Sequence, residues 1–265
     1  MKRPKVCVLR TAGTNCDYET YFAFYLAGGR PELVHINNFL SAKKSLKEFQ
    51  ILAIPGGFTY GDDIAAGKIL ANELRYKLLD ELSTFVAEGK LIIGICNGFQ
   101  VLVKAGLLPG NANFTQEVTL AINDSAKFED RWVYLKVPEE TISSSRCVWT
   151  KGIKEIIYLP VAHGEGKFIA ASGHILTRLK ENGQIVFQYC SAKGELAGYP
   201  YNPNGSQENI AGICDITGRI FGLMPHPERH IISLQHPRWY QQKKKEFGEG
   251  LVIFKNAVSY ARGID

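Results

Sequence analysis

Short apolar runs and helix-periodic segments alternate along the N-terminal part of the chain. The runs are nearly uninterrupted, which is typical of strands buried on both faces of a parallel sheet. They lie at residues 5–10, 33–37, 49–54 and 91–95. Asp17 is a candidate N-cap of a helix that extends to Gly28-Gly29, and apolar residues at helical spacing predict one long helix over 66–88. This alternation predicts an α/β fold with a mostly parallel central sheet covered by helices.

Shorter apolar runs separated by tight turns begin at about Ala112, and they are typical of antiparallel strands. Single strands are predicted at 131–137, 156–159 and 168–171, and a closing helix at 248–261. Two hairpins are predicted, one joining 174–180 to 184–190 through Asn182-Gly183 and one joining 210–216 to 220–224 through Thr217-Gly218. No linker-like stretch divides the chain, so we expect these strands to extend the same sheet within a single domain, 1–265.

The apolar run that ends at Ile95 is followed at once by a helix-forming segment, with Gly94-Ile95-Cys96-Asn97-Gly98 at the junction. A Gly-x-Cys-x-Gly turn between strand and helix resembles the nucleophile elbow of hydrolases, which commonly carry serine there. The glycines would let the backbone crowd together and hold Cys96 strained and exposed. A helix N-terminus favours a thiolate, so Cys96 is a candidate nucleophile. The alternative is a small buried core residue, as free cysteines often are.

Met224-Pro225-His226-Pro227-Glu228 supplies a candidate base and a candidate orienting acid for that nucleophile. The prolines keep the backbone extended, so that His226 and Glu228 project to the same side and can touch. A triad of Cys96, His226 and Glu228 follows. Two alternatives remain: a solvent-exposed polar turn, or a metal pair that takes a third ligand from His163-Gly164-Glu165.

An oxyanion hole for this nucleophile needs two N–H groups aimed at one point. The first candidate is the N–H of Asn97, which directly follows Cys96. The second is Gly57, in the turn Pro55-Gly56-Gly57 that ends the neighbouring predicted strand, although such a turn also occurs without any function.

Composition narrows the function classes. The net charge of +5 is small for 265 residues, and aromatic residues do not interleave with basic clusters, so no nucleic-acid surface is expected. Lys243-Lys244-Lys245 is interpreted as a solvated helix face or loop. No stretch is long enough to cross a bilayer, and no membrane association is expected. Six cysteines without a Cys-x-x-Cys pair indicate a reduced, cytoplasmic protein without a zinc site.

Six blocks, in order along the chain, resemble class I (triad) glutamine amidotransferases, and more narrowly the glutaminase-subunit branch of phosphoribosylformylglycinamidine synthases. The blocks are Gly13-Thr14-Asn15-Cys16-Asp17, Pro55-Gly56-Gly57-Phe58-Thr59-Tyr60-Gly61-Asp62, Gly94-Ile95-Cys96-Asn97-Gly98-Phe99-Gln100, Ala162-His163-Gly164-Glu165-Gly166, Asn202-Pro203-Asn204-Gly205-Ser206 and Met224-Pro225-His226-Pro227-Glu228-Arg229. The resemblance implies a flavodoxin-like, type 1 glutamine amidotransferase domain over 1–265.

The resemblance also implies the chemistry. Cys96 would attack the side-chain amide of glutamine to form a thioester, His226 would move the protons, and Glu228 would orient His226. Gln100 would contact the bound glutamine; its alternative role is a capping or core hydrogen bond. Ammonia would pass to a synthetase subunit, with or without a small bridging subunit. This chain would bind no cofactor or metal, whereas ATP and Mg would bind to the synthetase.

Two segments depart from the family pattern. The loop reads Arg10-Thr11-Ala12-Gly13 where the family usually has Phe-Pro before this glycine, and the segment 230–247 is longer than in the shortest members. We expect that segment to serve surface packing or subunit contact. A different Cys-His-acid hydrolase of similar fold, of the dienelactone-hydrolase or DJ-1-like kind, and a catalytically silent regulatory subunit are the alternative functions. The subfamily blocks oppose the first, and the presence of Cys96 and His226 opposes the second.

Overall fold

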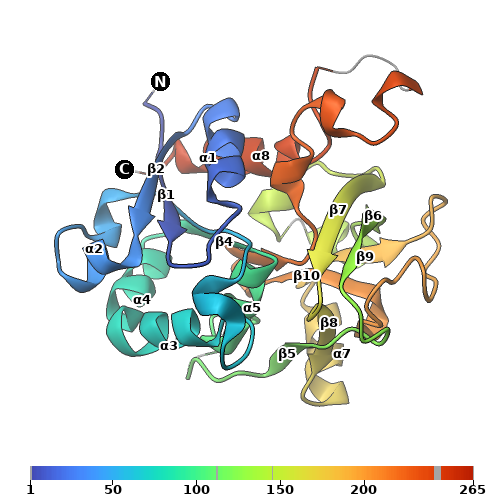
Figure 1. Cartoon of the computed structure of the whole chain (residues 1–265), viewed down its shortest axis with the longest axis horizontal. Coiled ribbons are helices and arrows are strands. Elements are labelled where there is room, and N and C mark those ends of the chain that lie inside the picture. The colour runs from blue at the N-terminus through green and yellow to red at the C-terminus, as the bar shows by residue number, and fades with distance from the viewer. Residues whose placement is uncertain (1, 112, 145, 242–245, 265) are drawn as a thin grey trace.

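The computed structural model describes residues 2–111, 113–144, 146–241 and 246–264. Within these residues the central sheet has nine strands in the order β2-β1-β3-β4-β11-β10-β9-β6-β7, and β5 and β8 form a separate pair (Figure 1). The strands are β1 (Lys5–Arg10), β2 (Arg30–His35), β3 (Ile51–Ile54), β4 (Leu91–Ile95), β5 (Val118–Ala121), β6 (Glu129–Lys136), β7 (Ile157–His163), β8 (Lys167–Ala170), β9 (Ile185–Cys190), β10 (Ile210–Cys214) and β11 (Ile220–Leu223).

The two halves of the central sheet differ in strand direction. Neighbouring strands from β2 to β11 run parallel, and the pairs from β11 through β10, β9 and β6 to β7 run antiparallel. Strand β4 is completely buried between β3 and β11, as its uninterrupted apolar run predicts. The predicted α/β fold with antiparallel extensions of one sheet is confirmed.

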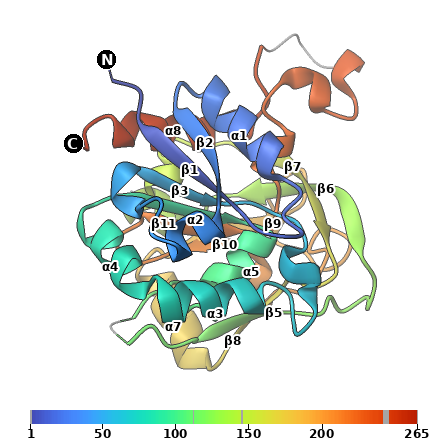
Figure 2. The ribbon, with the colours of Figure 1, turned by 60° about the vertical axis from the view of Figure 1, so that its left-hand side comes forward.

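Helices cover both faces of this sheet. The described α-helices are α1 (Asp17–Leu26), α2 (Ile36–Leu40), α3 (Lys68–Lys77), α4 (Leu79–Ala87), α5 (Asn97–Lys104), α6 (Glu139–Ser144), α7 (Gly173–Glu181) and α8 (Leu251–Ala261). Figure 2 shows α1 and α8 on one side and α3, α4 and α5 on the other. Phe24 of α1 and Phe254 of α8 pack edge to face at 5.0 Å, which fixes these two helices against each other. None of the described helices is long and apolar enough to span a membrane.

Two secondary-structure predictions are wrong. The helix predicted over 66–88 is two helices, because Leu78 leaves the helical conformation (φ −128°, ψ 9°) between α3 and α4. The first predicted hairpin does not exist, because 174–180 belongs to helix α7. There Ser172 caps the helix by accepting a hydrogen bond from the Ile175 N–H, a local signal that outweighs the apparent alternation of apolar residues. The second hairpin, β10 with β11, is confirmed.

Two other predicted elements have different boundaries in the structure. The second strand begins at Arg30 and ends at His35, whose imidazole caps α2 by accepting from the Asn37 N–H. Asp17 is the first residue of α1 rather than its N-cap, and its carboxylate lies 2.5 Å from the Arg10 guanidinium. Both changes leave the order of strands and helices as predicted.

The described part of the 230–247 segment packs on the surface strands β6 and β7. His236 lies against Trp132 and Tyr158 with ring centroids 5.6 and 5.5 Å apart, and His230 contacts the same Trp132 at 5.1 Å. This aromatic cluster agrees with the expected surface packing. The predicted basic run Lys243-Lys244-Lys245 lies outside the described residues.

Candidate active site

The junction between β4 and α5 has the strained geometry that the sequence predicts. Cys96 has a positive φ of 52°, rare for a residue with a side chain, and it directly precedes α5. A Cβ atom on Gly94 would lie 2.4 Å from the Gly98 carbonyl oxygen, and one on Gly98 would lie 1.9 Å from the Ile54 carbonyl oxygen. Only glycine allows this approach. The predicted exposure is wrong, since Cys96 is 6% exposed and therefore buried.

His226 and Glu228 are held together by a short turn after β11. The His226 Nδ1 atom lies 2.6 Å from Glu228 Oε1, and both side chains are buried. The backbone N–H of His226 donates to the Pro160 carbonyl oxygen of β7, which anchors the turn to the antiparallel half of the sheet. Burial opposes protonation of His226, yet the Glu228 carboxylate raises the pKa of His226 well above its ordinary value. A solvent-exposed turn is therefore ruled out.

The turn after β3 brings this pair to Cys96. A Cβ atom on Gly56 would lie 2.8 Å from His226 Cε1 and 3.5 Å from the Cys96 Cβ atom, so both residues border the same glycine. The buried His226 Nε2 atom has no hydrogen-bond partner among the described residues. Cys96 Sγ lies 3.7 Å from the Ala162 carbonyl oxygen. The three side chains predicted for the triad thus meet at the carboxyl ends of parallel strands β3, β4 and β11.

Asn97 and Gly57, the predicted oxyanion-hole residues, both lie in this corner. Asn97 is the first residue of α5, where a backbone N–H has no acceptor within the helix. Its side-chain oxygen accepts from the Thr59 hydroxyl at 2.6 Å, which ties the 3₁₀ turn Thr59–Asp62 to the helix. Gly57 has a φ of 138° and pairs with Thr14 in an isolated bridge. The role of these two N–H groups stays a prediction.

The loop that departs from the family pattern covers the Gly57 turn. The Gly13 carbonyl oxygen accepts from the Phe58 N–H at 2.9 Å, and the Ala12 carbonyl oxygen accepts from the Tyr60 N–H at 2.8 Å. Thr11 is buried, and its N–H donates to the Thr14 hydroxyl. The backbone of Thr11-Ala12-Gly13 therefore makes the contacts that hold the turn, and its unusual side chains do not prevent them.

Gln100 is buried one turn after Cys96, with both ends of its amide engaged. Its Nε2 atom donates to the Glu165 carbonyl oxygen at 2.6 Å, and its Oε1 atom accepts from Asn97 Nδ2 at 3.0 Å. The core hydrogen bond, which was the alternative role, is what the structure contains. Contact between Gln100 and glutamine stays a prediction.

Cys16 is a site residue to which the sequence analysis assigned no role. Its Sγ atom lies 3.0 Å from Nη2 of Arg229, and the ligand atoms of Cys16, His226 and Glu228 lie within 4.8 Å of one another. Within the described residues, Cys16 is therefore the third group of that cluster, rather than His163 or Glu165. The Arg229 guanidinium beside Cys16 disfavours a metal cation there. Both residues belong to quoted family blocks, which was the available signal.

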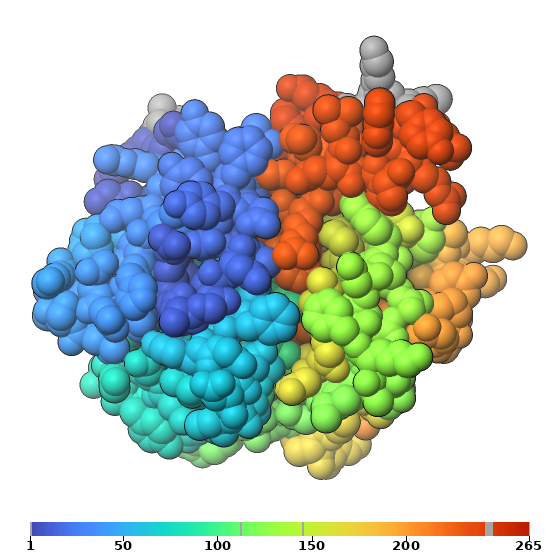
Figure 3. All heavy atoms as spheres, viewed as in Figure 1, coloured from blue at the N-terminus to red at the C-terminus, as the bar shows by residue number. Residues whose placement is uncertain are grey.

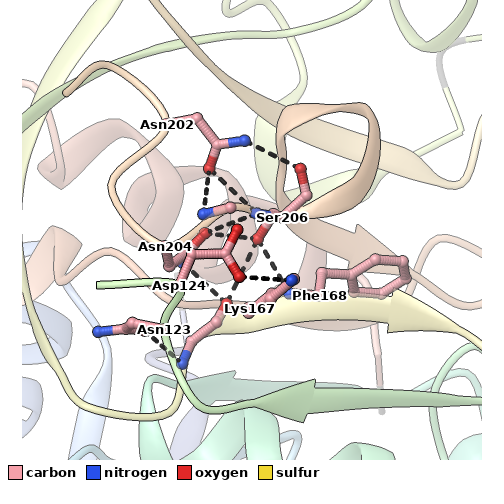
Figure 4. A network of polar contacts seen from close by, with 9 residues as sticks. Asn123, Asp124, Lys167, Phe168, Asn202, Asn204 and Ser206 are labelled. Carbon is pink, nitrogen blue, oxygen red and sulfur yellow. Dashed lines mark hydrogen bonds and ion pairs between the residues drawn. The ribbon is translucent and has the colours of Figure 1, made fainter. Parts of the chain in front are cut away.

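A polar network joins the block that ends at Gly166 to the block around Asn204, and Figure 4 shows Asn123, Asn204 and Ser206 within it. Asn204 Nδ2 donates to the Gly166 carbonyl oxygen at 2.8 Å, and the Phe168 N–H donates to the Ser206 hydroxyl at 2.9 Å. Asn123, which the sequence analysis missed, accepts from the Gly166 N–H at 3.0 Å through its Oδ1 atom. Segments far apart in the sequence are thus connected by hydrogen bonds to the turn 163–166, whose Glu165 carbonyl oxygen accepts from Gln100.

Comparison with known proteins agrees with this geometry. The family model of the CobB/CobQ-like glutamine amidotransferase domain matches residues 3–261. The chain is 51% identical to phosphoribosylformylglycinamidine synthase subunit PurQ of Dehalococcoides mccartyi over 100% of both chains. It is 46% identical to subunit PurQ of Methanococcus maripaludis over 97% of each. Among solved structures, a chain of PurLQS from Thermotoga maritima superposes with a TM-score of 0.73 at 30% identity, covering 98% of this chain and 99% of that one.

Proposed function

This chain belongs to the CobB/CobQ-like glutamine amidotransferase family, and we propose that it is the glutaminase subunit of phosphoribosylformylglycinamidine synthase. The observation that carries this proposal is the full-length similarity to PurQ subunits. The subunit hydrolyses glutamine to glutamate and ammonia, and it supplies the ammonia to a synthetase subunit in purine biosynthesis. The buried cluster of Cys96, His226 and Glu228 supports the same assignment.

We propose that Cys96 is the nucleophile. Its thiolate attacks the side-chain carboxamide carbon of glutamine, and the oxyanion that forms accepts from the N–H groups of Asn97 and Gly57. When this intermediate collapses, the carbon–nitrogen bond breaks and the nitrogen leaves as ammonia with a proton from His226. A γ-glutamyl thioester on Cys96 remains.

His226 serves both halves of this reaction. The raised pKa of His226, caused by Glu228 against the opposing effect of burial, keeps an imidazolium available to protonate the leaving nitrogen. The neutral imidazole that results takes a proton from water, and the hydroxide attacks the thioester carbon to release glutamate and the Cys96 thiolate. Glu228 holds the Nδ1 proton throughout, so that Nε2 carries out each transfer.

The synthetase subunit supplies the rest of the overall reaction. PurLQS from Thermotoga maritima, by its name, combines Q with L and S components. By the same division of labour, we propose that this chain binds a synthetase and a small bridging subunit, and that ATP and Mg bind to the synthetase. A cytoplasmic location stays a prediction, which cell fractionation would test.

We propose that the synthetase docks over two exposed rings at the rim of the site. Phe58 and Phe128 are 48% and 52% exposed and stack with centroids 6.5 Å apart. Phe58 directly follows Gly57, and Phe128 lies beside Gly164, so each ring adjoins a turn that holds site residues. In Figure 3 the cyan segment that contains Phe58 meets the bright green segment that contains Phe128. Because ammonia must reach the synthetase without loss to water, the synthetase should cover this rim.

Glutamate release tests the assignment. The purified chain is incubated with glutamine, alone and with its synthetase. We expect weak hydrolysis alone and strong stimulation in the mixture, because the oxyanion turn at Gly57 is the element we expect to shift on docking. The Cys96→Ala complex should still form product from ammonium salt, since that route bypasses the thioester. Failure of this complex to use ammonium would contradict the division of labour, and absence of glutamate from the wild-type mixture would contradict the function.

A further inference from the structure

His163 has a defined tautomer. Its Nδ1 atom lies 3.2 Å from Asn123 Oδ1. The orientation of the Asn123 amide is fixed, because Nδ2 donates to the carbonyl oxygens of Lys127 and His163 at 2.9 and 2.8 Å, while Oδ1 also accepts from the Gly166 N–H. An amide oxygen can only accept a hydrogen bond. The proton of the neutral imidazole therefore lies on Nδ1, and Nε2 carries a lone pair.

That lone pair is buried and unused. His163 is 3% exposed, and its Nε2 atom has no hydrogen-bond partner among the described residues. Burial, and after it the charge of His226, lower the pKa of His163 to about 3, so the ring remains neutral near pH 7. A buried acceptor without a partner is costly, and in native proteins such an atom calls for an explanation.

His163 borders the triad at the end of β7. The carbonyl oxygen of the preceding residue, Ala162, lies 3.7 Å from Cys96 Sγ. In the same strand, the Pro160 carbonyl oxygen accepts a hydrogen bond from the backbone N–H of His226. The ring is locked in place, because a Cβ atom on Gly166 would lie 2.4 Å from its Cε1 atom. The fixed ring of His163 thus directly follows the residue whose carbonyl oxygen contacts the nucleophile, without being part of the triad.

We propose that Nε2 of His163 accepts a hydrogen bond from the carboxamide NH₂ of the bound glutamine and thereby selects glutamine over glutamate. The proposal rests on the glutaminase function proposed above. A carboxamide presents an N–H donor to this lone pair, whereas the carboxylate of glutamate presents only acceptors. Such a site rejects the analogue that leaves its buried polar group unpaired. Since the Nδ1 proton is held by Asn123, the proton for the leaving nitrogen still comes from His226.

Two substitutions separate the two ring nitrogens. In His163→Asn the side-chain NH₂ can replace Nδ1–H toward Asn123, and the acceptor at the Nε2 position is removed. In His163→Gln an amide oxygen can reach that position, and the donor to Asn123 is removed. His174→Asn, at an exposed histidine of α7, is the matched control.

The measurement compares glutamine with its γ-methyl ester in the reconstituted complex. The ester has the same α-ammonium and carbonyl groups but no carboxamide N–H. Cys96 attacks it in the same way, with methanol leaving on the proton from His226. We expect His163→Asn to lower the ratio of kcat/KM for glutamine to that for the ester by roughly tenfold or more. His163→Gln and His174→Asn should keep the ratio within about threefold of wild type.

An unchanged ratio in His163→Asn overturns the proposal, because a positioning role, or a bond to the α-ammonium, reduces both substrates equally. If His163→Asn does not fold, a tenfold fall of the ratio in His163→Gln also overturns it. A second readout uses the inactive Cys96→Ala chain and calorimetry. Its preference for binding glutamine over glutamate should fall when His163→Asn is added, and an unchanged preference contradicts the proposal. If the wild-type complex releases no glutamate from glutamine, the proposed function itself fails.

Discussion

The His226 imidazole and the Glu228 carboxylate form a hydrogen-bonded pair, 2.6 Å from Nδ1 to Oε1, with exposed side-chain fractions of only 2% and 0%. Removing either partner leaves a buried polar group without compensation. The pair therefore contributes to the stability of the fold as well as to the proposed proton transfers.

Substitutions in the triad should rank by role. Cys96→Ala and His226→Ala remove the nucleophile and the proton carrier, so glutaminase kcat should fall by roughly 10⁴-fold or more. Glu228→Ala removes only the orienting group and should retain at least roughly tenfold more activity than His226→Ala. Glutamate release by the complex measures this. Full activity in His226→Ala would exclude the proposed role of the imidazole.

The pH dependence of stability should reveal the raised pKa of His226. A group whose folded pKa is raised stabilises the protein fully below its unfolded pKa, about 6.5 for histidine, and this contribution is lost as pH rises through the folded pKa. The free energy of unfolding of wild type minus that of Glu228→Gln should therefore decrease above pH 6.5. One proton allows a slope of at most about 1.4 kcal/mol per pH unit. When His226→Gln is introduced into both wild type and Glu228→Gln, the difference in unfolding free energy should no longer depend on pH in this range.

His163 should give the opposite trend. Because burial and the charge of His226 lower the pKa of His163 to about 3, its contribution to stability is present above its unfolded pKa of about 6.5 and is lost as pH falls. Relative to His163→Asn, wild type should lose about 2 kcal/mol of unfolding free energy between pH 7 and pH 5. Urea titrations at each pH would measure this. Parallel pH curves for the two proteins would contradict a buried neutral imidazole.

Cysteine labelling should be selective. An electrophilic glutamine analogue should react at Cys96, because this cysteine lies in the strained turn between β4 and α5, beside the triad histidine. Cys7 and Cys190 should be spared, since burial raises the pKa of each thiol. Cys16 is the stringent control, because it is the N-cap residue of α1 and also lies close to His226, but it does not directly follow a buried parallel strand as Cys96 does. Equal labelling of Cys16 and Cys96, by peptide mass mapping, would oppose the assignment of the nucleophile.

The aromatic rim should control docking. Phe58→Ala and Phe128→Ala remove exposed rings, so each should change unfolding free energy by less than about 1 kcal/mol while raising the Kd for the synthetase roughly tenfold. Tyr76→Ala, an exposed aromatic residue on α3, is the matched control and should leave the Kd unchanged. Surface plasmon resonance measures the Kd. If both Phe variants bound the synthetase with wild-type affinity, the proposed docking site at Phe58 and Phe128 would be wrong.

Local sequence was sufficient wherever neighbours along the chain decide the structure. The β4 run, the glycines around Cys96 and the closeness of His226 to Glu228 were predictable, because backbone sterics and a spacing of two residues determine them. Prediction failed where a local signal was overlooked. Ser172 caps α7 in a segment interpreted as a strand, and the non-helical backbone at Leu78 divides a helix that periodicity alone would continue.

Tertiary structure decided what the site residues touch. Cys96 and His226 meet because β11 pairs in parallel beside β4, and this strand order depends on packing between distant segments. The same packing placed Cys16 against Arg229 and left Nε2 of His163 buried, without a hydrogen-bond partner in the part of the chain that the structure describes. By itself the sequence determined which groups could do the chemistry, since residue type and spacing set their reactivity. Their distances, burial and tautomers were decided only by the fold, because hydrogen-bond partners and desolvation come from segments far away in the chain.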